Sequence, residues 1–341
     1  PRTRRRPARA SARVACGPAA SALLPRIQPA LRPVRHPPLR DHYETFIRQH
    51  RRDGLTSLLS KFPVLQRLIG TVLVLWSDNC SEMLERINAD RPALEAHFGI
   101  PRSHCLVAVQ QGLSDPHRGG RAVAVLEFSA SAAHDADRLR VVYKPKDMAV
   151  DAAYQTLLAD LNAHSDLAPL RCLTVHLSDG YGYMEFVPHQ LCADGQELVR
   201  FYTNAGRLTA VLHLLGCTDC HYENLIACAD QLLLIDTETL LEADLADHVD
   251  DANTKKLAIN QVSQLQQRCR SSVLRSGLLP NWMFVGVARR AMDISALGIS
   301  PPAAAEAQLP GWLGLNSDGM MPGREPQDVS IPTSLPVGIG S

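Results

Sequence analysis

The chain has 341 residues and a mass of 37.3 kDa, enough for two or three domains of ordinary size. Apolar residues make up 45% and charged residues 21%, which argues against a wholly disordered chain, a collagen-like chain and a coiled-coil rod. All 35 acidic side chains but only 25 of the 35 basic ones lie beyond residue 40, so that part carries a formal charge of −10. Such a sign argues against nucleic-acid binding.

The first forty residues differ from the rest, since they hold ten Arg, eight Pro and no Asp or Glu. An acid-free, Arg-rich start is typical of an organelle transit peptide, but so much proline opposes the amphipathic helix that targeting requires. A disordered basic leader is therefore the favoured interpretation of residues 1–40.

Nine scattered cysteines indicate reduced thiols and a cytoplasmic protein. The longest apolar run, residues 68–76, is half the length of a membrane span. Cys217 and Cys220 form a C-x-x-C, but no second pair with zinc spacing follows, so a structural zinc site is not expected there.

Residues 41–100 have apolar side chains at helical spacing and predict an N-terminal helical subdomain. Beyond residue 101 the period changes to 2, which predicts a small antiparallel sheet and an α+β fold. In chain order we expect an apolar run at 104–110, strands at 121–128 and 140–143, a helix at 151–162, a strand at 181–187, a helix at 199–215 that stops at Gly216, a strand at 232–236 and a helix around 257–274. The last twenty residues are rich in Pro, Gly and Ser and almost without periodicity, so the chain looks cut.

One set of polar residues has the chain order of a protein or lipid kinase. Lys144 closes a predicted strand, a D-x-H-x-x-N loop follows a helix, and Asp236 ends a buried strand. The loop residues are Asp219, His221 and Asn224. Phosphoryl transfer needs a cation on the nucleotide phosphates, an Asp near the incoming hydroxyl, and carboxylate and amide oxygens on Mg²⁺. Each residue alone is also typical of an ordinary surface, turn or cap position.

A second cluster, GLSDPHRGGR at residues 112–121, precedes the predicted sheet. Its glycines fit either a tight loop or a lid over phosphates. Asp115 and His117 stand two residues apart in it, as a general acid or base and its orienting partner can. Phosphoryl transfer alone does not need this pair.

Several segments together resemble the dehydratase domain of the class II lanthipeptide synthetases, the LanM enzymes. They are GLSDPHRGGRAV, RVVYKPKDMAVDAAYQTLLADLN, GYGYMEFVPH, FYTNAGRLTAVLHLLGCTDCHYENLIA, LLLIDTETLLE and NSDGMMPGREPQD. The resemblance covers about residues 41–335. It implies a lipid-kinase-like bilobal fold, with an N-lobe at 101–190 and a truncated C-lobe at 191–341.

The resemblance also implies a two-step dehydration of Ser and Thr in a ribosomal precursor peptide. ATP with Mg²⁺ first phosphorylates the hydroxyl, and the same site then eliminates phosphate to leave dehydroalanine or dehydrobutyrine. By this resemblance Lys144 contacts the nucleotide phosphates, and Asp219, His221 and Asn224 form the phosphorylation loop. Asp236 and Glu238 are the acids on the metal side, where Asn224 joins them, and Asp115 and His117 serve elimination.

The chain also departs from the family pattern. Further elimination residues, an Arg and a Thr, and the C-terminal cyclase domain with its zinc site are expected in a full-length synthetase but not found in these 341 residues. Two rival functions remain. One is a stand-alone kinase-like phosphotransferase, and the other is a non-catalytic fragment that binds a peptide.

Overall fold

We describe a computed structural model of the chain, which covers residues 41–131, 138–241, 272–280, 282–285, 290–293, 295–297 and 305–329. The chain divides into two compact units. The first unit comprises Pro1–Leu139 and Pro310–Glu325, and the second comprises Arg140–Leu309 and Pro326–Ser341. The basic segment 1–40 and most of the helix expected around 257–274 lie outside the described residues.

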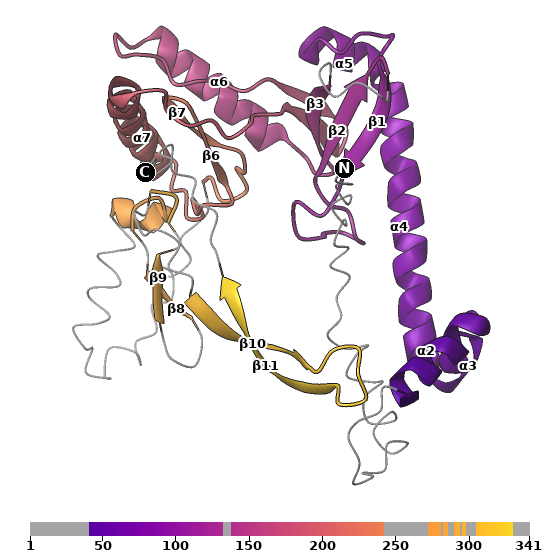
Figure 1. Cartoon of the computed structure of the whole chain (residues 1–341). Helices are drawn as coiled ribbons and strands as arrows, with labels where there is room; N and C mark the ends of the chain where they lie inside the picture. Colours follow the sequence, from indigo (N-terminus) through magenta and orange to yellow (C-terminus); the bar gives the residue numbers. More distant parts are fainter. Residues whose placement is uncertain are drawn as a thin grey trace, which may run out of the picture. The chain divides into compact units, whose positions relative to one another are not determined.

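The first unit begins with the helices that the apolar spacing predicts (Figure 1). They are α2 (Asp41–Arg52), α3 (Thr56–Lys61), α4 (Pro63–Ala89) and α5 (Arg91–Phe98). Proline stands in the first turn of α4 and of α5, where its missing N–H costs no helical hydrogen bond. Helix α5 ends at Gly99, whose φ of +65° is the left-handed conformation that glycine adopts readily.

Two antiparallel strands follow, β1 (Cys105–Gln110) and β2 (Ala124–Ser129), with an irregularity in register between Leu106 and Ala108. Strand β2 begins three residues later than its sequence pattern predicts. Later in the chain, β10 (Ala305–Leu313) pairs with β11 (Met321–Val329). Residues 322–329, although almost without periodicity, belong to this strand, because main-chain pairing needs no apolar pattern.

The second unit contains antiparallel strands with helices between them. Strand β5 (Tyr181–Glu185) pairs with both β3 (Leu139–Lys144) and β4 (Val175–Ser178). Helix α6 (Ala149–Ala163) connects β3 to β4, and α7 (Gly195–Leu214) precedes the hairpin of β6 (Leu225–Cys228) and β7 (Gln231–Leu234). The short helix η4 (Val273–Ser276) and the paired strands β8 (Trp282–Val285) and β9 (Arg290–Asp293) complete the unit. The mixed α+β class and the small antiparallel sheet are therefore confirmed.

Helix α7 has clear start and stop signals. Asp194 caps it by accepting a 2.8 Å hydrogen bond from the main-chain N–H of Glu197, and the Glu197 carboxylate accepts one from Ala193 N–H in return. The pair resembles a capping box, but the Glu197 carboxylate accepts from the residue before the N-cap. At the other end Gly216 has a φ of +63°, so the predicted stop of this helix is confirmed.

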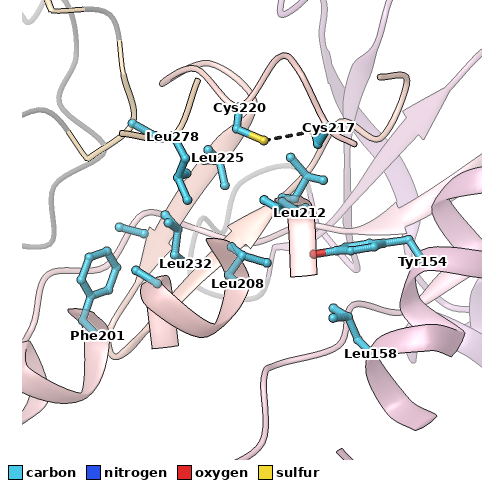
Figure 2. Packing of buried hydrophobic residues seen from close by; sticks show 14 residues of the cluster. Tyr154, Leu158, Phe201, Leu208, Leu212, Cys217, Cys220, Leu225, Leu232 and Leu278 are labelled. Carbon is cyan, nitrogen blue, oxygen red and sulfur yellow. Dashed lines mark hydrogen bonds between the residues drawn. The ribbon is translucent and has the colours of Figure 1, made fainter. Parts of the chain in front are cut away.

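The core of the second unit is formed where α6, α7 and the β6–β7 hairpin meet (Figure 2). Helix α7 contributes Phe201, Leu208 and Leu212, each at most 2% exposed. Burial of each such side chain stabilises the fold by about 1.5–3 kcal/mol. Because α7 and β6 both pack into this core, the eight residues that join Gly216 to β6 are held at both ends.

Candidate active site

Lys144 is the last residue of β3, and its side chain is buried. Its Nζ lies 2.9 Å from Oδ1 of Asp151, in the first turn of α6, and 2.5 Å from the main-chain oxygen of Ile235. A buried ammonium needs such partners, since an unpaired charge inside a protein is very costly. Asp151 was not singled out from the sequence, although an acid seven residues after a strand lysine is a signal that could have found it.

The three predicted loop residues lie in residues 217–224, which we call the Asp219 loop. Nδ2 of Asn224 donates to the main-chain oxygen of Asp219 at 2.8 Å and to its Oδ2 at 3.1 Å. The Nε2 of His221 lies 3.5 Å from Oδ1 of Asp219. The structure therefore brings Asp219, His221 and Asn224 together.

Asp236 and Glu238 follow β7, and a lysine that sequence reasoning missed joins them. Nζ of Lys146 lies 2.9 Å from Oδ1 of Asp236 and 2.7 Å from Oε1 of Glu238. Burial raises the pKa of Asp236, but the hydrogen bond and charge of Lys146 outweigh burial and hold this pKa below its ordinary value. Burial likewise lowers the pKa of Lys146, and the two carboxylates outweigh it and raise that pKa.

The main chain of Ile235 connects these groups. Its N–H donates to the main-chain oxygen of Asn224 at 2.9 Å, its oxygen accepts from Nζ of Lys144, and the next residue is Asp236. Lys144 and the main chain of Asn224 thus converge on the main chain of Ile235, the residue that precedes Asp236. The convergence of residues 91 positions apart in the sequence is a property of the folded second unit alone.

Asp115 and His117 belong to the first unit, in residues 112–121, which we call the glycine loop. Both side chains are exposed, and within the described part of the chain no hydrogen bond joins them. The main chains of His117 and Arg121 exchange two 2.8 Å hydrogen bonds around a turn in which Gly119 and Gly120 have φ of +83° and +92°. This geometry is that of a tight turn.

Helix α4 anchors the glycine loop. Nδ2 of Asn79 donates to the main-chain oxygen of Gly119 at 3.0 Å, and Nε of Arg121 lies 2.8 Å from Oε2 of Glu82. Glu82 also accepts from Arg86 at 2.6 Å. A side chain larger than glycine at position 120 would meet Asn79 at 3.2 Å, so helix and loop lie in close contact.

The donor set in the second unit suits a divalent cation. The carboxylates of Asp236 and Glu238 are hard oxygen ligands of the kind that Mg²⁺ prefers, and both already form an ion pair with Lys146. In the part of the chain that the structure describes, no donor reaches Oδ1 of Asn224, because its contacts are made through Nδ2. The second unit thus supplies the ammonium of Lys144, oxygen ligands for a metal, and the carboxylate of Asp219, which can accept a proton. These are the groups that phosphoryl transfer requires.

Comparison with known proteins gives the class of this chain. The family described as "Domain of unknown function (DUF4135)" matches residues 62–341. The chain therefore belongs to this family, whose domain is found in LanM-type lanthipeptide synthetases, and the resemblance seen in the sequence is confirmed.

A particular relative is the "Lacticin 481/lactococcin biosynthesis protein LcnDR2" of Lactococcus lactis subsp. lactis. It is 22% identical over 250 residues, which are 70% of this chain. The chain spans about a quarter of the length of this curated relative. Across the described residues, none of the helices is long and apolar enough to cross a bilayer.

Proposed function

We propose that this chain is the dehydratase part of a class II lanthipeptide synthetase. It would phosphorylate Ser and Thr hydroxyls of a ribosomal precursor peptide with ATP and then eliminate phosphate to give dehydroalanine or dehydrobutyrine. Family membership and the similarity to a lacticin 481 biosynthesis protein support the biosynthetic setting. The convergence of Lys144 and Asn224 on Ile235, next to Asp236, carries the proposed chemistry.

In the phosphorylation step Lys144 neutralises charge on the nucleotide phosphates, and Asp151 holds its ammonium in place. A strand lysine paired with an acid of the following helix is also how protein kinases orient theirs, which supports the kinase-like fold that we propose. Asp219 accepts the proton of the substrate hydroxyl, and His221 and Asn224 fix its carboxylate. Asn224, Asp236 and Glu238 would hold Mg²⁺, which supplies charge neutralisation between the phosphates.

In the elimination step a base removes the Cα proton of the phosphorylated residue, the Cα–Cβ double bond forms, and phosphate leaves from Cβ with the C–O electron pair. Phosphate is a far better leaving group than hydroxide, so phosphorylation divides one difficult reaction into two feasible ones. We assign Asp115 and His117 to this step. Both side chains are exposed on the glycine loop, and phosphorylation itself does not use them.

The test is to incubate the full chain with a lacticin 481-type precursor peptide, ATP and Mg²⁺, and to measure the peptide mass. Dehydration removes about 18 Da per residue, whereas phosphorylation alone adds about 80 Da. Asp236→Asn should leave the peptide unmodified, and Asp115→Asn should accumulate the phosphorylated form. Asp160→Asn, an exposed change on α6, serves as the matched control and should behave as the unaltered chain.

Other outcomes favour the rival functions. A stand-alone phosphotransferase would give only the heavier product and would be indifferent to Asp115→Asn. This rival has support of its own, because the residues for phosphoryl transfer all lie in the second unit. A non-catalytic peptide-binding chain would show neither product and no thermal stabilisation by ATP.

A further inference from the structure

The Asp219 loop contains a second pair of reactive groups that phosphoryl transfer does not use. The Sγ atoms of Cys217 and Cys220 lie 3.1 Å apart, and the two residues are 1% and 0% exposed (Figure 2). Asp219 stands between them in the sequence. Both thiols are free, and across the described residues they do not belong to a metal-binding group of three or more His, Cys, Asp or Glu side chains.

Main-chain hydrogen bonds hold both cysteines in this arrangement. The N–H of Cys217 donates to the oxygen of Leu212 at 3.0 Å, and the N–H of Cys220 donates to the oxygen of Ser276 at 2.8 Å. A disulfide requires an S–S distance of about 2.05 Å, so the sulfur atoms need to approach by only about 1 Å. Rotation about the Cα–Cβ bonds of two adjacent thiols can supply such a movement while the main-chain bonds stay in place.

The surroundings of the two thiols differ, which gives them different chemical roles. The hydrogen bond with Cys220 is the largest influence on Cys217 and lowers its pKa. Burial opposes this effect, and a 3.4 Å contact with Thr239 Oγ1 adds to it, so that the pKa of Cys217 falls to about 6. The hydrogen bond with Cys217, together with burial, raises the pKa of Cys220. This asymmetry favours Cys217 as the attacking thiolate and Cys220 as the thiol that resolves.

A tyrosine adds a second observation. The side chain of Tyr154 packs in the same core, and its buried hydroxyl has no hydrogen-bond partner in the described part of the chain. Burial, followed by the electrostatic effect of Cys220, Cys217 and Cys172, raises the pKa of Tyr154, so the phenol stays protonated.

We propose that Cys217 and Cys220 are a redox modification site that closes to an intramolecular disulfide by exchange with a small disulfide such as oxidised glutathione. The Cys217 thiolate attacks one sulfur of glutathione disulfide, forming a mixed disulfide and releasing one glutathione thiolate. That thiolate takes the proton of Cys220, whose sulfur then attacks Sγ of Cys217 and releases the second glutathione as a thiolate. Two protein sulfurs are oxidised, and one glutathione disulfide is reduced to two glutathiones.

The bridge would close a four-residue ring around Thr218 and Asp219 and would fix the conformation of the Asp219 loop. Because both thiols are buried, the reaction waits for local opening of the loop and should be slow. This inference does not depend on the proposed function, since the disulfide and its effect on the loop can be measured without substrate.

The test uses the purified full chain in glutathione buffers of increasing oxidised fraction, incubated until the composition stops changing. Free thiols are then alkylated in denaturant, and the peptides are identified by mass. We expect a Cys217–Cys220 bridge that takes no alkylating reagent, and amide exchange across residues 217–224 that is slowed severalfold. Cys220→Ser should trap glutathione on Cys217, whereas Cys105→Ser, at an exposed position, should leave the bridge unchanged.

Full alkylation of Cys217 and Cys220 under conditions that glutathionylate the exposed Cys105 would overturn the proposal. The wild-type chain alone decides this outcome, so a Cys220→Ser variant that failed to fold would not obscure it. Pairing of either cysteine with a different cysteine would overturn it equally.

Discussion

The ammonium of Lys144 lies 2.9 Å from the carboxylate of Asp151, and these side chains are only 5% and 2% exposed. The pair joins the end of β3 to the first turn of α6, and through Ile235 it also reaches the end of β7. A buried pair of this kind contributes little net stability as a whole, but the loss of one partner leaves the other charged and unsatisfied.

Asp151→Ala should therefore lower the free energy of unfolding by about 3–5 kcal/mol, because Lys144 loses its counter-ion inside the core. Urea denaturation of the full chain measures this loss. Asp160→Ala on the exposed side of α6 is the matched control and should change stability by less than about 0.5 kcal/mol. Equal effects of the two substitutions would contradict a buried ion pair.

Lys146→Met tests the charge arrangement around Asp236 and Glu238. Removal of this ammonium leaves neither carboxylate with an ion-pair partner among the described residues, so Mn²⁺ should bind about tenfold more tightly without nucleotide, or ~1.4 kcal/mol. Electron paramagnetic resonance of free Mn²⁺ gives the affinity. Lys61→Met, which removes an exposed lysine of α3, should leave the Mn²⁺ affinity unchanged. Weaker Mn²⁺ binding by Lys146→Met would refute the idea that Lys146 and the metal compete for these carboxylates.

Glu82 makes the attachment of the glycine loop depend on pH. The hydrogen bond from Arg121, with the charges of Arg86 and Arg121, outweighs burial and lowers the pKa of Glu82 from its ordinary value of 4.5. A carboxyl whose pKa is lower in the folded state stabilises the fold fully above the unfolded value, and this contribution disappears as pH falls through the folded value.

Glu82→Gln should thus cost about 0.5–1 kcal/mol at pH 7, a modest amount because these side chains are partly exposed. The difference from wild type should shrink steadily below pH 4.5, toward zero once the carboxyl is protonated. Urea unfolding at a series of pH values checks this trend. Glu85→Gln, an exposed change on the same helix, provides the baseline, and a difference that grew in acid would have the wrong sign.

Gly182 tests the packing of β5. A Cβ at this position would lie 2.5 Å from the main-chain oxygen of His176 and 2.8 Å from Sδ of Met148, so Gly182→Ala should destabilise the second unit by about 1–3 kcal/mol. Gly206→Ala is the counterpart, because nothing lies within 4 Å of its Cβ and it is inside α7. Gly206→Ala should raise the free energy of unfolding by about 0.5–1 kcal/mol, and thermal unfolding measures the effect of both substitutions.

Long periodic elements could be predicted from the sequence, because their apolar spacing reports which face is buried. Helices α4 and α7 and the stop at Gly216 are examples. Strand β4, with the sequence VHLS, was missed because four residues are too few for a pattern, and its pairing with β5 depends on main-chain contacts.

The candidate site was likewise predictable only in part. Asp219, His221 and Asn224 were found because they share one short loop. Lys146 and Asp151 were not, since each acquires its role only from a partner that the fold brings near. The proximity of Asp115 and His117 in sequence, conversely, does not produce a hydrogen bond between their side chains in the described residues.

The position of Ile235 has an evolutionary consequence. Its main-chain N–H and oxygen, and not its side chain, contact Asn224 and Lys144, while the side chain packs against a buried apolar cluster, so other apolar residues can stand there. Proline is the exception, since it lacks the N–H that Asn224 accepts. Exchange of Ile235 for another apolar residue should therefore leave these two main-chain contacts in place, and a search for invariant side chains would pass over the centre of the site.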